Sequence, residues 1–334
     1  MDRHTKPTNA LGPCRLPLVL MLSLLAGPSF AVTVADLYQA SQSPVASSRD
    51  AAFAEALKTV AVRVSGQRDA ATRLPSSALA NPRQYAQRIA FAADGTLDVT
   101  FDSASVDRIL SSAGLPIWGR ERPATLLLVS VEEPSGSSHW LSLESPAAER
   151  EAIVRAAKLR GLPIVWPSDR AQVGALSDTN PASLLQAAAR YGANATLRGR
   201  ARRDGAGGFQ TRWTLASEEV SSDATGTLED GVHLAADSFA RVFAASGSTI
   251  DSVALEVAGI GDLKAYAATL NYLEGLTVVR GVAVEQVSGD TMRFRIAVRG
   301  DRETLRRAIS LDTRLAPLDA SGAASDRLAF RYRP

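Results

Sequence analysis

Cys14 is the only cysteine among the 334 residues of this chain, and its position limits the folds that the chain can adopt. It precedes an apolar run rather than following it, so it does not stand where a lipoprotein carries its acylated cysteine. Beyond Cys14 the chain can form no internal disulfide and no cysteine-based metal site. The fold must therefore depend on an ordinary apolar core, which a chain of this length is able to bury.

Residues 1–31 have the pattern of a secretory signal peptide. Three basic residues, the last of them Arg15, precede an apolar run of eleven residues from Leu16 to Ala26. A membrane-spanning helix needs about 20 residues, so the run suits a signal peptide better than a span. Small residues at Ser29 and Ala31 favour cleavage after Ala31. We expect export to the periplasm of a Gram-negative cell; the alternative is an uncleaved membrane anchor.

The charge balance excludes one class of partner. Three of the 37 basic residues and one of the 35 acidic residues lie in residues 1–31, so the rest of the chain carries 34 of each sign. Proteins that bind nucleic acid owe much of their affinity to a positive surface that neutralises phosphates. We therefore expect no nucleic-acid partner, and the exported chain has no further stretch of transmembrane length.

Hydrophobic periodicity and chain breaks predict an α+β protein of three small modules. The first, residues 32–119, contains a helix over about 48–62, whose apolar residues recur at three- and four-residue spacing. A second helix is expected to begin at Asn81-Pro82, because Asn caps helices and Pro suits the first helical position. The Thr96–Phe101 segment alternates in the manner of a strand.

The other two modules alternate helices with strands. The central module, residues 120–247, predicts an α/β layer structure with a hairpin of 195–203 and 209–216 across a glycine-rich turn. The C-terminal module, residues 248–334, has the order strand, helix, strand, strand, helix, strand. That order is typical of a ferredoxin-like, split βαβ sandwich.

A short sequence motif occurs in both of the first two modules. Gly114-Leu115-Pro116-Ile117-Trp118 is repeated as Gly161-Leu162-Pro163-Ile164-Val165-Trp166. In each case a left-handed glycine is expected to end a helix, and the proline prevents the helix from continuing. We interpret the tryptophans as packing residues at joints between modules rather than as ligand cages.

Several stretches carry a resemblance to a known family. They are Ala35–Ala40, Val62–Arg68, Asn81–Tyr85, Val106–Leu110, Gly114–Gly119 and Arg122-Pro123. Together they resemble the proteobacterial envelope family called domain of unknown function 2066. The resemblance implies a secreted or periplasmic protein and assigns no activity, cofactor or site residue. Leu184–Leu215 is loosely similar to small α/β domains of periplasmic assembly factors, which is an analogy of fold only.

The sequence offers no strong signature of a metal or cofactor site. His139 and His233 are far apart, and neither has a second histidine at ligand spacing. The serine-hydrolase elbow and the phosphate-binding loop are also absent from the sequence. The Gly259–Lys264 segment comes nearest to a dinucleotide fingerprint, but Lys264 stands where glycine is needed, and Asp262 is better explained as a helix cap. We expect no cofactor.

Acidic pairs leave one enzymatic alternative open. Glu132-Glu133 and Glu218-Glu219 would point to opposite faces of a strand, whereas general acid–base catalysis needs carboxyl groups that converge on one bond. Convergence between modules is not visible in a sequence. A cofactor-free, cell-wall-active hydrolase with a carboxylate pair is therefore the alternative function.

Two rows of arginines are the candidate site. Each row alternates with apolar residues, which predicts a sheet with one packed face and one solvated face. The arginines either pair with nearby acids or form a surface for an anionic partner such as an envelope polymer. The residues are Arg198, Arg200 and Arg202 in the central module, and Arg293, Arg295 and Arg299 in the C-terminal module. The sequence thus favours a non-enzymatic binding or assembly module for another envelope component.

Overall fold

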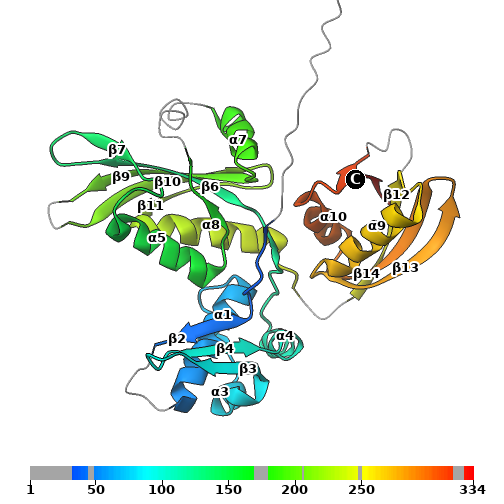
Figure 1. The fold of residues 1–334 in the computed structure, drawn as a ribbon, viewed down its shortest axis with the longest axis horizontal. Coiled ribbons are helices and arrows are strands. Elements are labelled where there is room, and N and C mark those ends of the chain that lie inside the picture. The colour runs from blue at the N-terminus through cyan, green and yellow to red at the C-terminus, as the bar shows by residue number, and fades with distance from the viewer. Residues whose placement is uncertain (1–31, 44–48, 169–179, 205–206, 247–249, 319–326) are drawn as a thin grey trace, which may run out of the picture.

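A computed structural model describes residues 32–43, 49–168, 180–204, 207–246, 250–318 and 327–334 (Figure 1). The expected signal peptide, 1–31, and the expected boundary between the central and C-terminal modules, at 247–248, lie outside these residues. The α+β class is confirmed, because the described residues form helices together with antiparallel and mixed sheets. None of the helices in the described ranges is long and apolar enough to cross a membrane.

The N-terminal region packs helices on a small antiparallel sheet. Helix α1 spans Arg49–Ser65, and its buried residues include Phe53, Leu57 and Val60, as the spacing predicts. Its apolar face meets a sheet of order β2-β4-β3. The other elements are β1 (Val32–Thr33), β2 (Gln39–Gln42), α2 (Ala70–Arg73), α3 (Ser76–Ala80), η1 (Pro82–Tyr85), β3 (Ala86–Phe91), β4 (Leu97–Phe101), α4 (Ser103–Ser112) and β5 (Glu121–Arg122).

The prediction of a helix that begins at Asn81-Pro82 is wrong beyond the first turn. Pro82–Tyr85 is a single 3₁₀ turn, and the Asn81 side chain makes no cap hydrogen bond. The chain then enters β3, which pairs with β4 from Ala86 to Phe91. Pairing with the next strand along the chain, in an antiparallel hairpin, outweighed the local start signal, because the ladder satisfies the backbone groups that a longer helix would otherwise satisfy.

The central region is a six-stranded sheet with helices on both faces (Figure 1). The strand order is β11-β10-β9-β6-β7, with β8 beside β6. The expected hairpin is confirmed, since β9 and β10 pair from Arg203↔Phe209 to Ala195↔Ser217. Strands β7 and β11 were not expected. The elements are β6 (Thr125–Glu132), β7 (Ser138–Trp140), α5 (Ala147–Arg160), β8 (Ile164–Val165), α7 (Pro181–Arg190), β9 (Ala195–Arg203), β10 (Phe209–Ser217), β11 (Ser221–Gly226) and α8 (Leu228–Phe243).

Strand β6 shows why both faces are covered. Leu127 and Val129 lie in the core that α5 and α8 close, whereas Leu126 and Leu128 pack with Leu184 of α7 on the opposite face. Successive side chains of a strand point to opposite faces, so an uninterrupted apolar run requires a layer on each side.

The C-terminal region is a five-stranded sheet of order β13-β14-β12-β16-β15. Its elements follow the expected strand–helix–strand–strand–helix–strand order, with the short β15 added. Asp262 caps α9, as expected, by accepting a hydrogen bond from the Ala265 N–H at 2.7 Å. The elements are β12 (Ile250–Ala258), α9 (Leu263–Gly275), β13 (Val279–Ser288), β14 (Thr291–Arg299), α10 (Arg302–Ser310), β15 (Leu315–Pro317) and β16 (Leu328–Tyr332).

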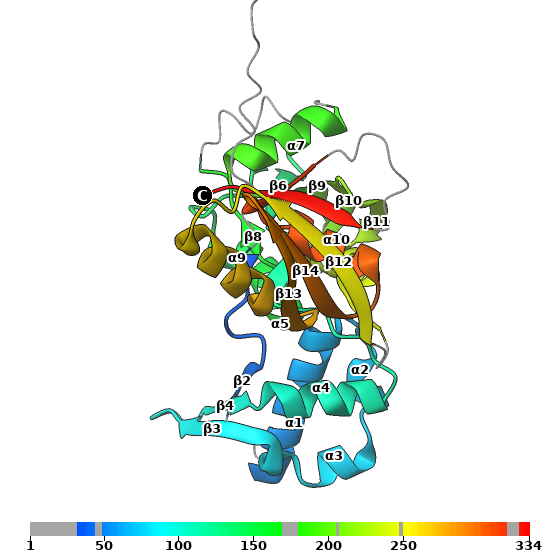
Figure 2. The ribbon, with the colours of Figure 1, turned by 90° about the vertical axis from the view of Figure 1, so that its right-hand side faces the viewer.

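A fully buried arginine joins the N-terminal and central regions, which meet where α1 and α5 end (Figure 2). The Arg122 guanidinium donates five hydrogen bonds of 2.7–3.0 Å, all to backbone carbonyls, and lies 3.8 Å from the centre of the Trp118 ring. Carbonyls at helix C-termini attract a cation. The acceptors belong to Arg63, Trp118, Gly119, Arg160 and Gly161.

The repeated glycines act as expected at this joint. Gly114 and Gly161 have φ of 66° and 60°, the left-handed conformation that ends a helix. A Cβ at Gly161 would lie 2.7 Å from Nη1 of Arg122, so this position also requires the close approach that only glycine allows. Trp118 is completely buried, which agrees with a packing role.

Candidate binding cleft

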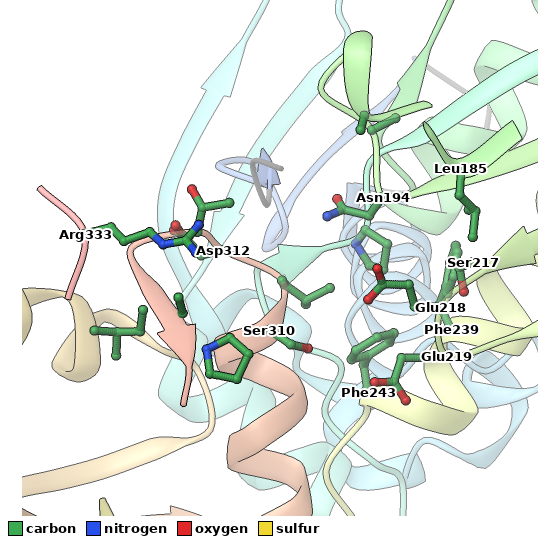
Figure 3. A pocket seen from close by; sticks show the side chains of 18 residues that line it. Leu185, Asn194, Ser217, Glu218, Glu219, Phe239, Phe243, Ser310, Asp312 and Arg333 are labelled. Carbon is green, nitrogen blue, oxygen red and sulfur yellow. The ribbon is translucent and has the colours of Figure 1, made fainter. Parts of the chain in front are cut away.

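A cavity of about 290 Å³ lies where the central region meets the C-terminal region (Figure 3). One wall comes from α7, the start of β9, the β10–β11 turn and α8, and the other from the turn after α10, from β15 and from Arg333. Most of its lining residues are apolar. They include Leu185, Ala189, Phe239 and Phe243 on one wall and Leu311, Leu315, Ala316 and Pro317 on the other.

Local structure positions two carboxylates on the central wall. In the β10–β11 turn the Ser217 N–H donates to the Val220 carbonyl at 2.8 Å, and the Ser217 hydroxyl accepts from the Val220 N–H at 2.9 Å. These bonds close a turn whose two middle residues, Glu218 and Glu219, are exposed. Figure 3 shows both residues on this wall and Asp312 and Arg333 on the facing one.

Ion pairs bind the two walls together at one edge of the cleft. Glu219 accepts from Arg306 of α10 at 3.0 Å, and Arg306 also contacts Glu303 at 2.7 Å. The hydrogen bond to Glu303 raises the pKa of Arg306, and the same bond lowers the pKa of Glu303. Arg306 and Glu303 therefore remain charged near neutral pH, and the contact between Arg306 and Glu219 holds α10 against the β10–β11 turn.

Glu218 and Arg333 differ from their neighbours. Asp312 is paired with Arg314 at 3.2 Å, and Glu219 with Arg306. Within the part of the chain that the structure describes, neither the Glu218 carboxylate nor the Arg333 guanidinium forms an ion pair. The cleft thus combines apolar walls with one available charge of each sign on opposite sides.

The expected arginine row of β9 lies on one face of its strand. Arg198, Arg200 and Arg202 alternate with Leu197, Gly199 and Ala201, which are buried. Arg202 pairs with Glu132 at 3.2 Å, and Arg198 and Arg200 also have interaction partners.

The row of β14 is likewise paired with acids. Arg293 faces Glu256 at 3.6 Å and Arg295 contacts Glu285 of β13. Arg299 reaches Asp107 of α4 at 3.4 Å, so it ties the C-terminal region to the N-terminal one. The two rows lie on separate sheets. These contacts favour local pairing, the alternative that the sequence left open.

The structure brings carboxylates from distant segments to one cavity, as the enzymatic alternative requires, but the set differs from the one that the sequence suggested. Glu218 and Glu219 share the cleft with Asp312. Glu132 and Glu133 lie elsewhere and contact Arg202 and Arg203. Neither Asp312 nor Arg333 stands out in the sequence, because each is an ordinary charged residue near an element end.

A comparison with protein families finds a match in the N-terminal region. A family model described as "Domain of unknown function (DUF8605)" matches residues 31–119. No curated protein matches the chain. The match supports a domain of unknown function, but not the specific family that the sequence resembles. It ends before every residue of the cleft.

Proposed function

We propose that this protein is an exported, non-enzymatic binding or assembly module for another envelope component, and that the cleft is its recognition site. The observation that carries the proposal is a cavity whose apolar walls come from two regions and whose facing sides carry Glu218 and Arg333, which form no ion pair with any residue that the structure describes. Binding sites are mostly apolar, carry few polar groups, and occur preferentially between domains.

The size and chemistry of the cleft indicate what it accepts. A volume of about 290 Å³ falls at the small end of ligand sites, which run from about 300 to 1,000 Å³. An apolar side chain of a partner protein, flanked by a basic and an acidic group, would match the walls, Glu218 and Arg333. The export part of the proposal rests on the charged start and short apolar run of residues 1–31.

A cavity-filling variant tests the proposal. A photoreactive side chain at Thr313, a half-buried lining residue outside the β10–β11 turn, is used first to capture and identify the partner in periplasmic extract. Ala189→Trp then fills the cleft from a half-buried helix position, and Ala148→Trp on the exposed start of α5 is the matched control. We expect Ala189→Trp to weaken binding at least tenfold and the control to bind as the unmodified protein does. Equal binding by both variants refutes the cleft as the site.

A second candidate function follows from the acids in the same cavity. Two of the three carboxylates Glu218, Glu219 and Asp312 would form the carboxylate pair of a cell-wall hydrolase. Glu219 and Asp312 form ion pairs with Arg306 and Arg314, and this pairing argues against the enzymatic function. Release of soluble fragments from purified peptidoglycan, lost in Glu218→Gln, would replace the binding proposal with the enzymatic one.

The arginine row of β14 gives a separate prediction, which distinguishes local pairing from an anionic-partner surface. Replacing Arg293, Arg295 and Arg299 with Gln should reduce stability and leave partner binding intact, because carboxylates of the same chain face all three. Loss of a salt-sensitive interaction without loss of stability would instead restore the arginine row as a binding surface.

A further inference from the structure

Three potential metal ligands converge at one end of the central sheet, away from the cleft. Glu133 directly follows β6, His139 lies in β7, and Glu149 lies in the first turn of α5. One ligand atom from each residue falls within a group no more than 4.8 Å across. His139 Nε2 lies 3.3 Å from Glu149 Oε2, and His139 Nδ1 lies 3.9 Å from Glu133 Oε1.

The fold explains how residues separated in sequence meet. Strands β6 and β7 pair through Val131↔His139, and the Glu133 N–H donates to the Ser137 carbonyl at 2.8 Å to close the hairpin. The beginning of α5 then brings Glu149 beside the imidazole. A tight hairpin therefore supplies two of the ligands and a helix start supplies the third.

Arg203 fixes the orientation of both carboxylates. Its Nε lies 2.9 Å from Glu133 Oε2, and its Nη2 lies 2.7 Å from Glu149 Oε1. The guanidinium packs 4.4 Å from the centre of the Phe209 ring, which limits its movement. Arg203 thus occupies one oxygen of each carboxylate, and the other oxygen of each is the one nearest to His139.

We propose that Glu133, His139 and Glu149 bind a divalent transition-metal ion of the zinc type, with Arg203 as the outer-shell residue that orients the two carboxylates. Imidazole and carboxylate ligands suit zinc, and catalytic zinc sites use three protein ligands with water in an open position. Outer-shell hydrogen bonds commonly fix ligating carboxylates. The two carboxylates carry two negative charges and the Arg203 guanidinium carries one positive charge. With a neutral imidazole, the cluster therefore has a net charge of −1 and attracts a cation.

The competing explanation is an ion network without metal, in which a protonated His139 bridges the two glutamates. Both explanations place His139 between Glu133 and Glu149, so they must be separated by metal binding itself. The chain offers a matched control, because His233 is the other histidine beyond residue 31 and contacts Arg160 and not this cluster.

Calorimetric titration of the purified full chain, without a histidine tag, with ZnCl₂ tests the proposal. We expect one zinc ion per chain, at least tenfold weaker binding in His139→Ala and Glu149→Gln, and unchanged binding in His233→Ala. Mg²⁺ and Ca²⁺ should not compete, because both prefer oxygen ligands. No heat at 100 µM zinc, or equal affinity in His139→Ala and the unmodified chain, overturns the proposal.

A second measurement needs no variant. The ¹⁵N resonances of the His139 ring are followed while zinc is added at constant pH. Direct coordination shifts one ring nitrogen selectively, whereas an ion network without metal leaves both resonances where they were. A selective shift at His139 with none at His233 supports the site, and unchanged resonances refute it.

Discussion

The central region meets its two neighbours in different ways. At the first joint Arg122 is completely buried and its five hydrogen bonds end on backbone carbonyls. At the second joint Arg306, whose side chain is 37% exposed, pairs with carboxylates at the edge of a cavity. Buried donors matched to fixed backbone acceptors resist rearrangement, whereas exposed ion pairs contribute little. The first joint is therefore expected to stabilise the fold more than the second, and a cavity remains open at the second.

The largest expected effect is at Arg122. Replacing it with Met removes every donor from five buried carbonyls, and we expect a loss of about 4 kcal/mol in the free energy of unfolding. Urea unfolding followed by circular dichroism measures the change. Arg122→Lys keeps the positive charge but has fewer N–H donors, so we expect an intermediate loss of unfolding free energy. A loss below about 1 kcal/mol for Arg122→Met would show that the two joints do not differ in this way.

Gly161 gives the next largest effect. Gly161→Ala forces a left-handed alanine against Arg122 and Arg63, whereas Gly192→Ala, at φ of 69°, meets no atom within 4 Å. A left-handed alanine alone costs about 1–2 kcal/mol. We expect that loss for Gly192→Ala and about 1–3 kcal/mol more for Gly161→Ala, from the added crowding. Equal melting temperatures for the two variants would contradict close packing at the joint.

Arg306 tests the second joint. Arg306→Gln removes the pairs with Glu219 and Glu303, and exposed pairs of this kind contribute at most about 1 kcal/mol. The loss should shrink further in 0.5 M salt because screening weakens the pairs. A loss as large as that of Arg122→Met would mean that ion pairs, and not buried donors, hold the molecule together.

The smallest expected effect is a pH dependence at the first joint. His233 accepts a hydrogen bond from Arg160, and its surroundings include Arg68, Asp230 and Asp237. Burial, and then Arg160 and Arg68, lower the pKa of His233 below its usual value of 6.5. The unfolded chain therefore binds a proton before the folded chain does, and stability falls as the pH drops below about 6.5 toward the folded-state pKa.

His233→Asn should flatten this part of the pH profile. The measurement is the urea midpoint at pH 7.5, 6.5 and 5.5 for the variant and the unmodified chain. His139→Asn is the control, because it leaves the contact with Arg160 in place. An unchanged pH slope in His233→Asn would mean that other groups cause the acid loss.

Much of the fold could be predicted where the signal is local. The glycine that ends α5, the aspartate that caps α9 and the paired strands on either side of the 204–208 turn were all expected and all occur. Asn81-Pro82 has the same kind of signal, yet β3 forms instead, because its backbone groups find partners on β4. The cap signal failed here because the neighbouring strand of a hairpin competed for the same backbone groups.

The residues of the two candidate sites could not be predicted from local sequence patterns. Glu218 and Arg333 lie on facing walls only because the central and C-terminal regions meet, and Glu133 meets Glu149 only after a hairpin and a helix have formed. No spacing rule links these residues. The arginine rows, by contrast, were visible as alternation, but their acidic partners on neighbouring strands and on α4 were not.

The sequence by itself determined the absence of disulfides beyond Cys14, the α+β class and most helix ends, because these depend on residue type and on neighbours a few positions away. The tertiary structure decided which charges are neutralised, which cavity stays open and which side chains converge. Those properties depend on contacts between segments distant in the chain, and a sequence pattern of a few residues carries no information about them.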